Sequence, residues 1–221
     1  MSEEQTLDAL KDIRALMERS SRFISLSGWS GVAAGVCALG GASVAYPYVM
    51  GDYQNFVPSD DETARMIRHQ SIAGIISHPL FLIAACTFIA AFITAFIFTY
   101  IKSQKDGIPI WGKTSARLLI NGAIPLATGG LFIIRLVQMN YFGLIAPACL
   151  IFYGLSLLNA SKYTYREIRW LGIAQLILGL LNCWNIGYGF YFWTIGFGAM
   201  HIVYGAIMWW KYDRNNEPDK P

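Results

Sequence analysis

The chain has 221 residues, of which 55% are hydrophobic and only 14% are charged, and its formal net charge is +3. A soluble domain carries about 25% charged residues, so this composition excludes an ordinary water-soluble globular protein. No nucleic-acid partner is expected.

The charged residues are confined to short segments that separate long uncharged runs. No Lys, Arg, Asp or Glu occurs in residues 23–51, 70–101, 118–134, 136–161 or 170–210. A membrane span needs about 20 apolar residues, whereas a buried helix of a soluble protein needs about 10–14. The runs therefore predict an all-α fold, a polytopic membrane helical bundle whose first partner is the lipid bilayer.

Residues 1–22 are polar and contain no small-residue cleavage pattern, which argues against a cleavable signal peptide. Within them, residues 2–20 predict an amphipathic helix, because apolar side chains recur at helical spacing on one face, namely Leu7, Leu10, Ile13 and Met17. We expect this helix to lie in the cytoplasm and to pack against the inner loops, a second copy of the chain or a cytoplasmic protein partner, and we take the partner as the working hypothesis.

The first predicted span, residues 23–49, carries small residues at four-residue spacing, namely Ser27, Gly31 and Gly35. Such spacing lets helix backbones approach closely in lipid. The contact could be made within the monomer or across a homodimer, and the pattern leaves both alternatives open.

An outer loop with a short interfacial helix is predicted for residues 51–79. The sequence "SDDE" at residues 59–62 forms a capping box that starts this helix. The second span, residues 80–101, follows Pro79, which suits the first turn of a helix.

The later apolar runs are too long for single spans. Residues 118–161 would extend about 66 Å as one helix, roughly twice the ~30 Å hydrocarbon layer. Turn-forming residues predict reversals at "QMNYFG", residues 138–143, and at "NIGYG", residues 185–189. The remaining spans are then 118–137, 141–161, 168–186 and 190–210, which makes six, and residues 211–221 form a polar tail that we expect to be disordered.

The distribution of Lys and Arg sets the orientation of the transmembrane domain, residues 23–210. With the N-terminus inside, fourteen of the 17 Lys and Arg residues fall in inner segments and three fall outside, namely Arg65, Arg68 and Arg135. This asymmetry predicts that both termini are cytoplasmic. The shared pattern of "YGLSLLNASKY" and "YGAIMWWKY" at two inner ends suggests three tandem helical hairpins.

Two stretches resemble a known group of proteins. "ERSSRFISLSGWSG", residues 18–31, and "YGLSLLNASKYTYREIRWLG", residues 153–172, are similar to small bacterial multi-pass membrane proteins without an established activity. The resemblance implies a location in the bacterial inner membrane. It carries over no catalytic residue.

His201 is the most deeply placed ionisable residue, near the middle of the sixth span. Gln175 and Asn182 on the fifth span lie at similar depth, and Tyr204 lies one turn below His201. Ionisable residues at such depth are rare and are candidates for function. His201 could equally be a neutral imidazole hydrogen-bonded to one of these three residues, holding helices together. A metal or haem ligand is the remaining alternative.

Arg135 interrupts an apolar run close to the outer surface, with Gln138 and Asn140 nearby. Its long side chain could simply reach the headgroup layer. Alternatively, the three residues could line an outward-facing polar pocket below the acidic outer loop.

No phosphate-binding loop, nucleophile elbow, zinc-binding HExxH motif or paired-carboxylate site occurs in the sequence. The four cysteines lie singly in different apolar runs, so neither a metal nor another cofactor is expected. We therefore expect a non-enzymatic sensing or protein-interaction component of the membrane. The alternative is a small-solute transporter or channel with His201 lining the path.

Overall fold

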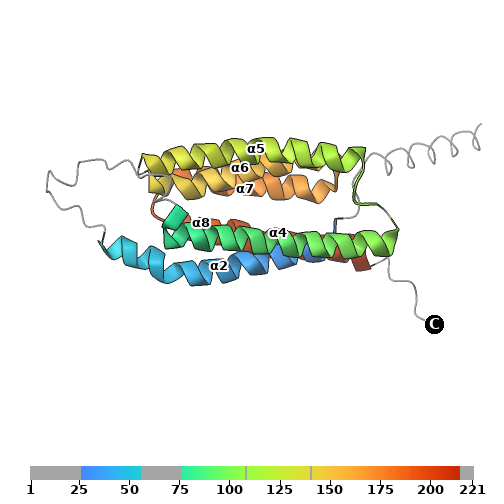
Figure 1. The fold of residues 1–221 in the computed structure, drawn as a ribbon, viewed down its shortest axis with the longest axis horizontal. Helices are drawn as coiled ribbons and strands as arrows, with labels where there is room; N and C mark the ends of the chain where they lie inside the picture. The colour runs from blue at the N-terminus through green and yellow to red at the C-terminus, as the bar shows by residue number, and fades with distance from the viewer. Residues whose placement is uncertain (1–25, 56–75, 108, 140, 215–221) are drawn as a thin grey trace, which may run out of the picture.

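The computed structural model describes residues 26–55, 76–107, 109–139 and 141–214, and these residues are almost entirely helical (Figure 1). The predicted amphipathic helix of residues 2–20 lies outside the described residues. So do most of the predicted outer loop and the last part of the tail.

The described residues form long helices that run side by side along the long axis of the molecule (Figure 1). Their bounds are α2 (Gly28–Asn55), α4 (Pro79–Asp106), α5 (Lys113–Gln138), α6 (Ile145–Ala160) and α7 (Arg166–Trp184). One continuous helix follows, which we call the last helix. It consists of α8 (Gly189–Trp193), the π-helix η4 (Thr194–Met200), α9 (His201–Met208) and the π-helix η5 (Trp209–Asp213). The short 3-10 turns η2 (Phe142–Leu144) and η3 (Ser161–Tyr163) flank α6.

Five of these helices are long and apolar enough to cross a membrane: α2, α4, α5, α6 with its flanking turns, and the last helix. α7 has 19 residues, but Glu167, Arg169, Gln175 and Asn182 make it more polar than the others. The predicted all-α membrane fold is thus confirmed at the level of five apolar helices.

The helices form two layers, with α5, α6 and α7 in one and α2, α4 and the last helix in the other (Figure 1). Neighbours in sequence pack together in the pairs α2–α4 and α5–α6. The third predicted hairpin differs, because α7 packs mainly on α6 while the last helix packs mainly on α2. The last helix also contacts α6 and α7, and so joins the two layers.

The distribution of exposed and buried side chains is the reverse of that in a soluble protein. Large apolar side chains are exposed, including Phe88 at 65%, Phe92 at 61% and Leu131 at 71%, whereas many buried side chains are polar, including Ser103, Ser156 and Gln175. A water-soluble protein does not expose apolar faces of this size, whereas a membrane protein covers them with acyl chains. The described helices are therefore those of a transmembrane protein.

The chain reverses where turn-forming residues predict it. α5 ends at Gln138 and the next helical turn begins at Phe142, while α7 ends at Trp184 and α8 begins at Gly189. In the second reversal Gly187 has φ 108°, a backbone conformation that favours glycine. Pro79 occupies the first turn of α4, as predicted.

Glycines bring α2 and the last helix into close contact. A Cβ on Gly31 would lie 3.0 Å from the Cα of Gly205, and a Cβ on Gly35 would lie 2.7 Å from the carbonyl oxygen of Gly198. Ser27 is also buried at the beginning of this contact. The close approach predicted for Ser27, Gly31 and Gly35 is thus made within one chain.

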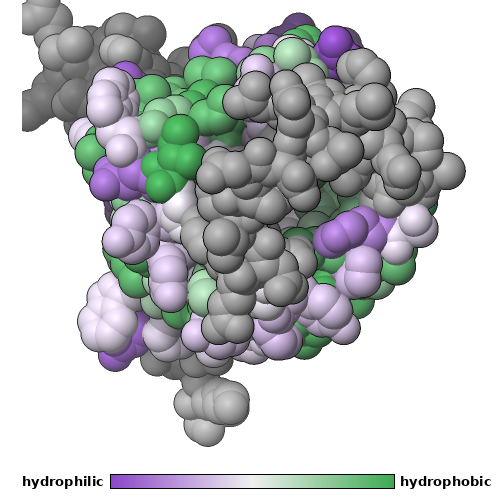
Figure 2. Space-filling view, turned by 90° about the vertical axis from the view of Figure 1, so that its left-hand side faces the viewer, coloured by the Kyte–Doolittle hydropathy of each residue, from purple (hydrophilic) through white to green (hydrophobic). Residues whose placement is uncertain are grey.

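The two ends of the bundle are distinguished by the chain segments that they contain. One end, which we call the clasp end, contains the beginning of α2 and the end of the last helix, while the opposite turn end contains both reversals (Figure 1). Figure 2 looks onto the turn end, where weakly polar and hydrophilic residues mix with apolar ones on the part of the face that the described residues form.

Candidate functional site

The predicted intramembrane site is centred on His201, which is 7% exposed. Its Nδ1 lies 3.0 Å from the carbonyl oxygen of Gly196, and its Nε2 lies 2.7 Å from the hydroxyl oxygen of Tyr153. A carbonyl can only accept, so Nδ1 carries a proton and donates it to Gly196. In a neutral imidazole of this tautomer the Tyr153 hydroxyl would donate to Nε2, and both ring nitrogens would be satisfied.

Gly196 lies in the π-helical segment η4, and its carbonyl oxygen also accepts a hydrogen bond from Nε2 of Gln175 at 2.7 Å. The carbonyl oxygen of Gly196 thus accepts hydrogen bonds from a side chain of α7 and from a side chain of the last helix. A Cβ on Gly196 would overlap Cδ2 of Leu150 and lie 2.6 Å from Oε1 of Gln175, so a larger residue there would force one of these side chains to shift.

The structure brings together only part of the predicted cluster. His201 and Gln175 meet at the Gly196 carbonyl, but Asn182 lies two turns further along α7 and donates to the carbonyl of Asn185 at 3.0 Å. Within the described residues, no hydrogen bond joins Tyr204 to His201. The predicted partners of the imidazole were therefore wrong, since Tyr153 and a backbone carbonyl take their place.

Two buried oxygens in this region accept no hydrogen bond from the residues that the structure describes, namely Oε1 of Gln175 and Oδ1 of Asn182. Both side chains are fully buried. Such atoms are costly in an apolar environment. Chemically, the region holds α6, α7 and the last helix together through hydrogen bonds, and it leaves two acceptors for a further donor.

At the turn end, Arg135 and Gln138 lie together on the last turn of α5. Nη1 of Arg135 is 3.4 Å from Oε1 of Gln138, and Arg135 is exposed. A cation in the last turn also interacts favourably with the negative end of the helix dipole. Asn140 and the acidic loop lie outside the described residues.

A set of polar contacts at the clasp end joins α2, α4 and the last helix. Asp213 lies at its centre: Oδ1 is 2.6 Å from Nζ of Lys102, and Oδ2 accepts hydrogen bonds from the amide of Gly28 at 2.9 Å and from the hydroxyl of Ser27 at 3.2 Å. Nζ of Lys102 also donates to the carbonyl of Leu26 at 3.1 Å. The carboxylate therefore binds both the positive N-terminus of α2 and the nearly buried ammonium of Lys102.

A second ion pair lies beside the first. Oε1 of Glu167 is 2.5 Å from Nζ of Lys211, and Oε2 accepts from the hydroxyl of Tyr212 at 2.9 Å. Burial acts to raise the pKa of Glu167, but the hydrogen bonds from Lys211, from its own backbone and from Tyr212 outweigh burial and lower it. The Tyr212 ring stacks on Tyr165 at 4.2 Å between centroids.

We call these contacts the clasp: Ser27, Gly28, Lys102, Glu167, Lys211, Tyr212 and Asp213. The sequence predicted Asp213 to belong to a disordered tail, whereas the last helix continues through it. Nothing near Asp213 in the sequence indicates its role, because its partners are more than 100 residues away. Tyr153, in contrast, could be identified from the sequence as a partner of His201. It lies nine residues before Lys162, and His201 lies ten residues before Lys211, so the two side chains are expected at the same depth.

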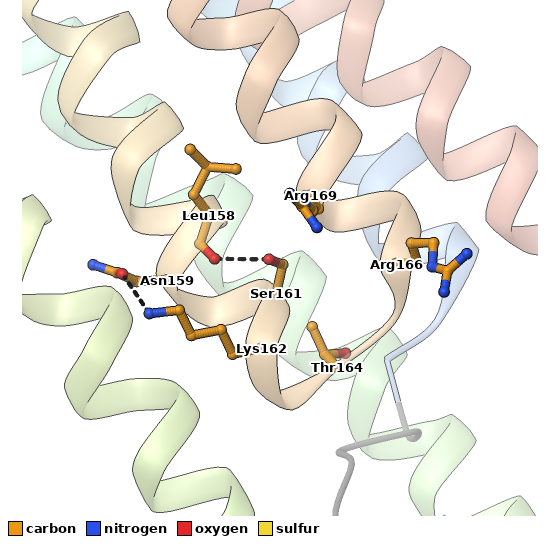
Figure 3. Close-up of a pocket in the computed structure, with 7 residues that line it drawn as sticks. All are labelled: Leu158, Asn159, Ser161, Lys162, Thr164, Arg166 and Arg169. Carbon is orange, nitrogen blue, oxygen red and sulfur yellow. Dashed lines mark hydrogen bonds between the residues drawn. The ribbon is translucent and has the colours of Figure 1, made fainter. Parts of the chain in front are cut away.

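A basic depression opens at the clasp end between α6 and α7, with a volume of about 510 Å³. Figure 3 shows Lys162 and Asn159 on one side, Arg166 and Arg169 on the other, and Ser161 and Thr164 between them. Nζ of Lys162 is 3.5 Å from Oδ1 of Asn159, and the Ser161 hydroxyl donates to the carbonyl of Leu158. In the sequence these cations indicate only the orientation of the chain, because their position around one depression depends on how α6 and α7 pack.

Within the described part of the chain, no three His, Cys, Asp or Glu residues lie close enough to hold a metal ion. The cysteines Cys37, Cys86, Cys149 and Cys183 are all free thiols. Comparison of the chain with protein-family models, curated proteins and solved structures finds no match.

Proposed function

We propose that this chain is a six-span inner-membrane protein that acts as a non-enzymatic sensing or interaction component, with both termini in the cytoplasm. The observation that carries the proposal is the clasp. It fixes the point at which residues 1–25 join the bundle, because Leu26, Ser27 and Gly28 are all hydrogen-bonded to Lys102 or Asp213.

The clasp connects the state of the bundle to the N-terminal segment. Asp213 ends the last helix, which packs on α2 through glycines and carries His201 inside the membrane. A shift of the last helix along α2 would move Asp213 away from Ser27 and Gly28, the residues from which the chain leads into residues 2–20. A partner that binds residues 2–20 would respond to that change.

The arrangement of the helices supports α7 as the sixth membrane span, and the distribution of charge supports the orientation. α7 runs between the two ends of the bundle like its neighbours, which supports its counting as a span (Figure 1). The clasp end is also rich in Lys and Arg, as expected for a cytoplasmic surface. Accessibility of single cysteines placed near residues 26 and 214 in intact cells tests this orientation.

Photocrosslinking tests the interaction. A photoreactive residue at position 10, on the predicted apolar face of residues 2–20, should crosslink to one defined cytoplasmic protein in cells. The same residue at position 12, on the predicted opposite face, is the matched control. Crosslinks of equal strength at both positions, or none at either, would contradict the proposal.

A second experiment separates the clasp from the partner surface. Asp213→Asn keeps the size of the side chain but removes its charge, and should change the yield of the position 10 crosslink at least several-fold without removing the chain from the membrane. An unchanged yield would show that the clasp does not control the N-terminal segment.

A small-solute transporter is the second candidate, and the unpartnered oxygens of Gln175 and Asn182 favour it. Acceptors without donors at membrane depth could serve a passing polar molecule. Proteoliposomes containing a pH-sensitive dye would report proton flux. A flux above that of empty vesicles that His201→Gln abolishes would support this alternative, and equal fluxes would exclude proton movement through His201.

A further inference from the structure

The basic depression between α6 and α7 has the chemistry of a phosphate site. Lys162, Arg166 and Arg169 line it, together with the polar side chains of Asn159, Ser161 and Thr164. No carboxylate lines it, and within the described residues no ion pair involves Arg166 or Arg169. Figure 3 shows the Lys162 ammonium turned towards Asn159 and the Arg166 guanidinium on the opposite side, so the cations give the rim of the depression a positive charge without meeting at one point.

The acidic residue nearest in sequence does not neutralise the depression. Glu167 lies between Arg166 and Ile168, but its two oxygens accept from Lys211 and Tyr212 of the last helix. Its side chain is also 12% exposed, so it turns into the bundle while Arg166 turns outward. The positive charge of the depression is therefore left for a ligand.

An exposed apolar stripe on α7 begins next to these arginines. Trp170, Ile177, Leu181 and Trp184 recur at helical spacing, and all are at least half exposed. Between Arg166 and Ile177 α7 rises about 17 Å, close to the ~15 Å depth of one leaflet's hydrocarbon. The stripe thus continues from the depression along the path that an acyl chain would take.

We propose that the depression binds the phosphate of an anionic glycerophospholipid. Arg166 and Arg169 bind the phosphate oxygens, Lys162 adds the third charge, and the acyl chains lie along Trp170 and Ile177. Basic pockets between transmembrane helices are suited to anionic headgroups, because arginine binds phosphate in a bidentate manner. The site is separate from the clasp and does not depend on the proposed partner of residues 2–20.

The apolar stripe favours a lipid over a free phosphate compound. A soluble phosphate would gain nothing from Trp170 or Ile177, whereas a lipid places its glycerol and chains against them. An aromatic residue such as Trp170 is also favoured at the headgroup level of a bilayer.

Native mass spectrometry of the full chain in mild detergent tests the site. The chain is titrated with phosphatidylglycerol and, separately, with phosphatidylcholine carrying the same acyl chains. We expect the wild type to prefer phosphatidylglycerol, and the Arg166→Gln/Arg169→Gln variant to bind it about 10-fold more weakly or worse. Arg166→Lys/Arg169→Lys keeps the charge and should retain part of the affinity.

The matched control is Lys105→Gln/Lys113→Gln, which removes two exposed cations that do not line the depression. Elution volume and helical circular dichroism check that each variant is folded. Equal binding of the two lipids by the wild type, which needs no variant, would overturn the proposal. So would equal loss in the site variant and the control.

Inorganic phosphate and glycerol 3-phosphate distinguish the source of the phosphate. Neither should displace phosphatidylglycerol at millimolar concentration, because neither uses the apolar stripe. Displacement by either compound would show that the depression holds a soluble phosphate instead of a lipid.

Discussion

The carboxylate of Asp213 lies 2.6 Å from the ammonium of Lys102, although 111 residues separate them in the sequence. The two side chains are 13% and 11% exposed, and the same carboxylate binds the first amide of α2. The last described turn of the chain is therefore part of the membrane domain, where it completes the N-terminus of α2.

Asp213→Asn should destabilise the protein by about 1–3 kcal/mol, because it leaves Lys102 nearly buried without its counter-ion. Thermal unfolding in detergent measures the loss. Lys102→Gln should cost a similar amount, and the double variant should cost less than the sum. Lys105→Gln, an exposed change on the same helix, should stay within about 0.5 kcal/mol of the wild type. Strictly additive effects would show that the pair is not coupled.

Gly205→Ala should destabilise the bundle by about 2 kcal/mol or more. Its Cβ would lie 2.7 Å from the carbonyl oxygen of Gly28 and 2.5 Å from the amide nitrogen of Val32, and neither backbone atom can move away cheaply. Gly40→Ala on α2 is the control, because a Cβ there meets nothing within 4 Å. Similar melting temperatures for the two variants would contradict the close contact of α2 with the last helix.

Tyr153→Phe should cost about 1 kcal/mol, because it removes the hydroxyl that donates to Nε2 of His201. Tyr204→Phe, one turn from His201, should have almost no effect, since no hydrogen bond joins its hydroxyl to the described residues. The chemical shift of the His201 ring nitrogens would report the same contact. An unchanged Nε2 resonance in Tyr153→Phe would count against it.

Stability should fall in acid because of Glu167. Its folded pKa is lower than the ordinary value of 4.5, so its contribution is complete above pH 4.5 and is lost as the pH falls through the folded value. Melting curves of the wild type and of Glu167→Gln between pH 3 and 7 measure this. The difference between them should shrink towards pH 3. A difference that stays constant with pH would show that the Glu167 carboxylate is not held by Lys211 and Tyr212.

The lengths of the apolar runs predicted the helical architecture, because the lipid bilayer fixes how many apolar residues a spanning helix needs. The reversals near residues 140 and 187 follow from the fixed thickness of the hydrocarbon layer and from local turn chemistry, and both are encoded within a few residues. α7 departs from the pattern because its buried face carries Gln175 and Asn182, which lower its hydropathy without changing its length.

The contacts of the candidate site were less predictable because they join distant segments. His201 could be identified from its depth, but its partner Tyr153 could be found only by matching depths between two helices. Asp213 had no such signal, since a single acid in a polar tail resembles any other. The basic depression also depends on how α6 and α7 meet at η3, a packing relationship that is absent from any single helix.

The glycine contact between the first and last described helices has a consequence for biosynthesis. α2 is made before the last helix, so the surface of Gly31 and Gly35 finds its partner only after Gly198 and Gly205 have left the ribosome. Packing of α2 against the last helix therefore waits until Asp213 has been made, and chains truncated before Asp213 should be recognised by quality-control proteases.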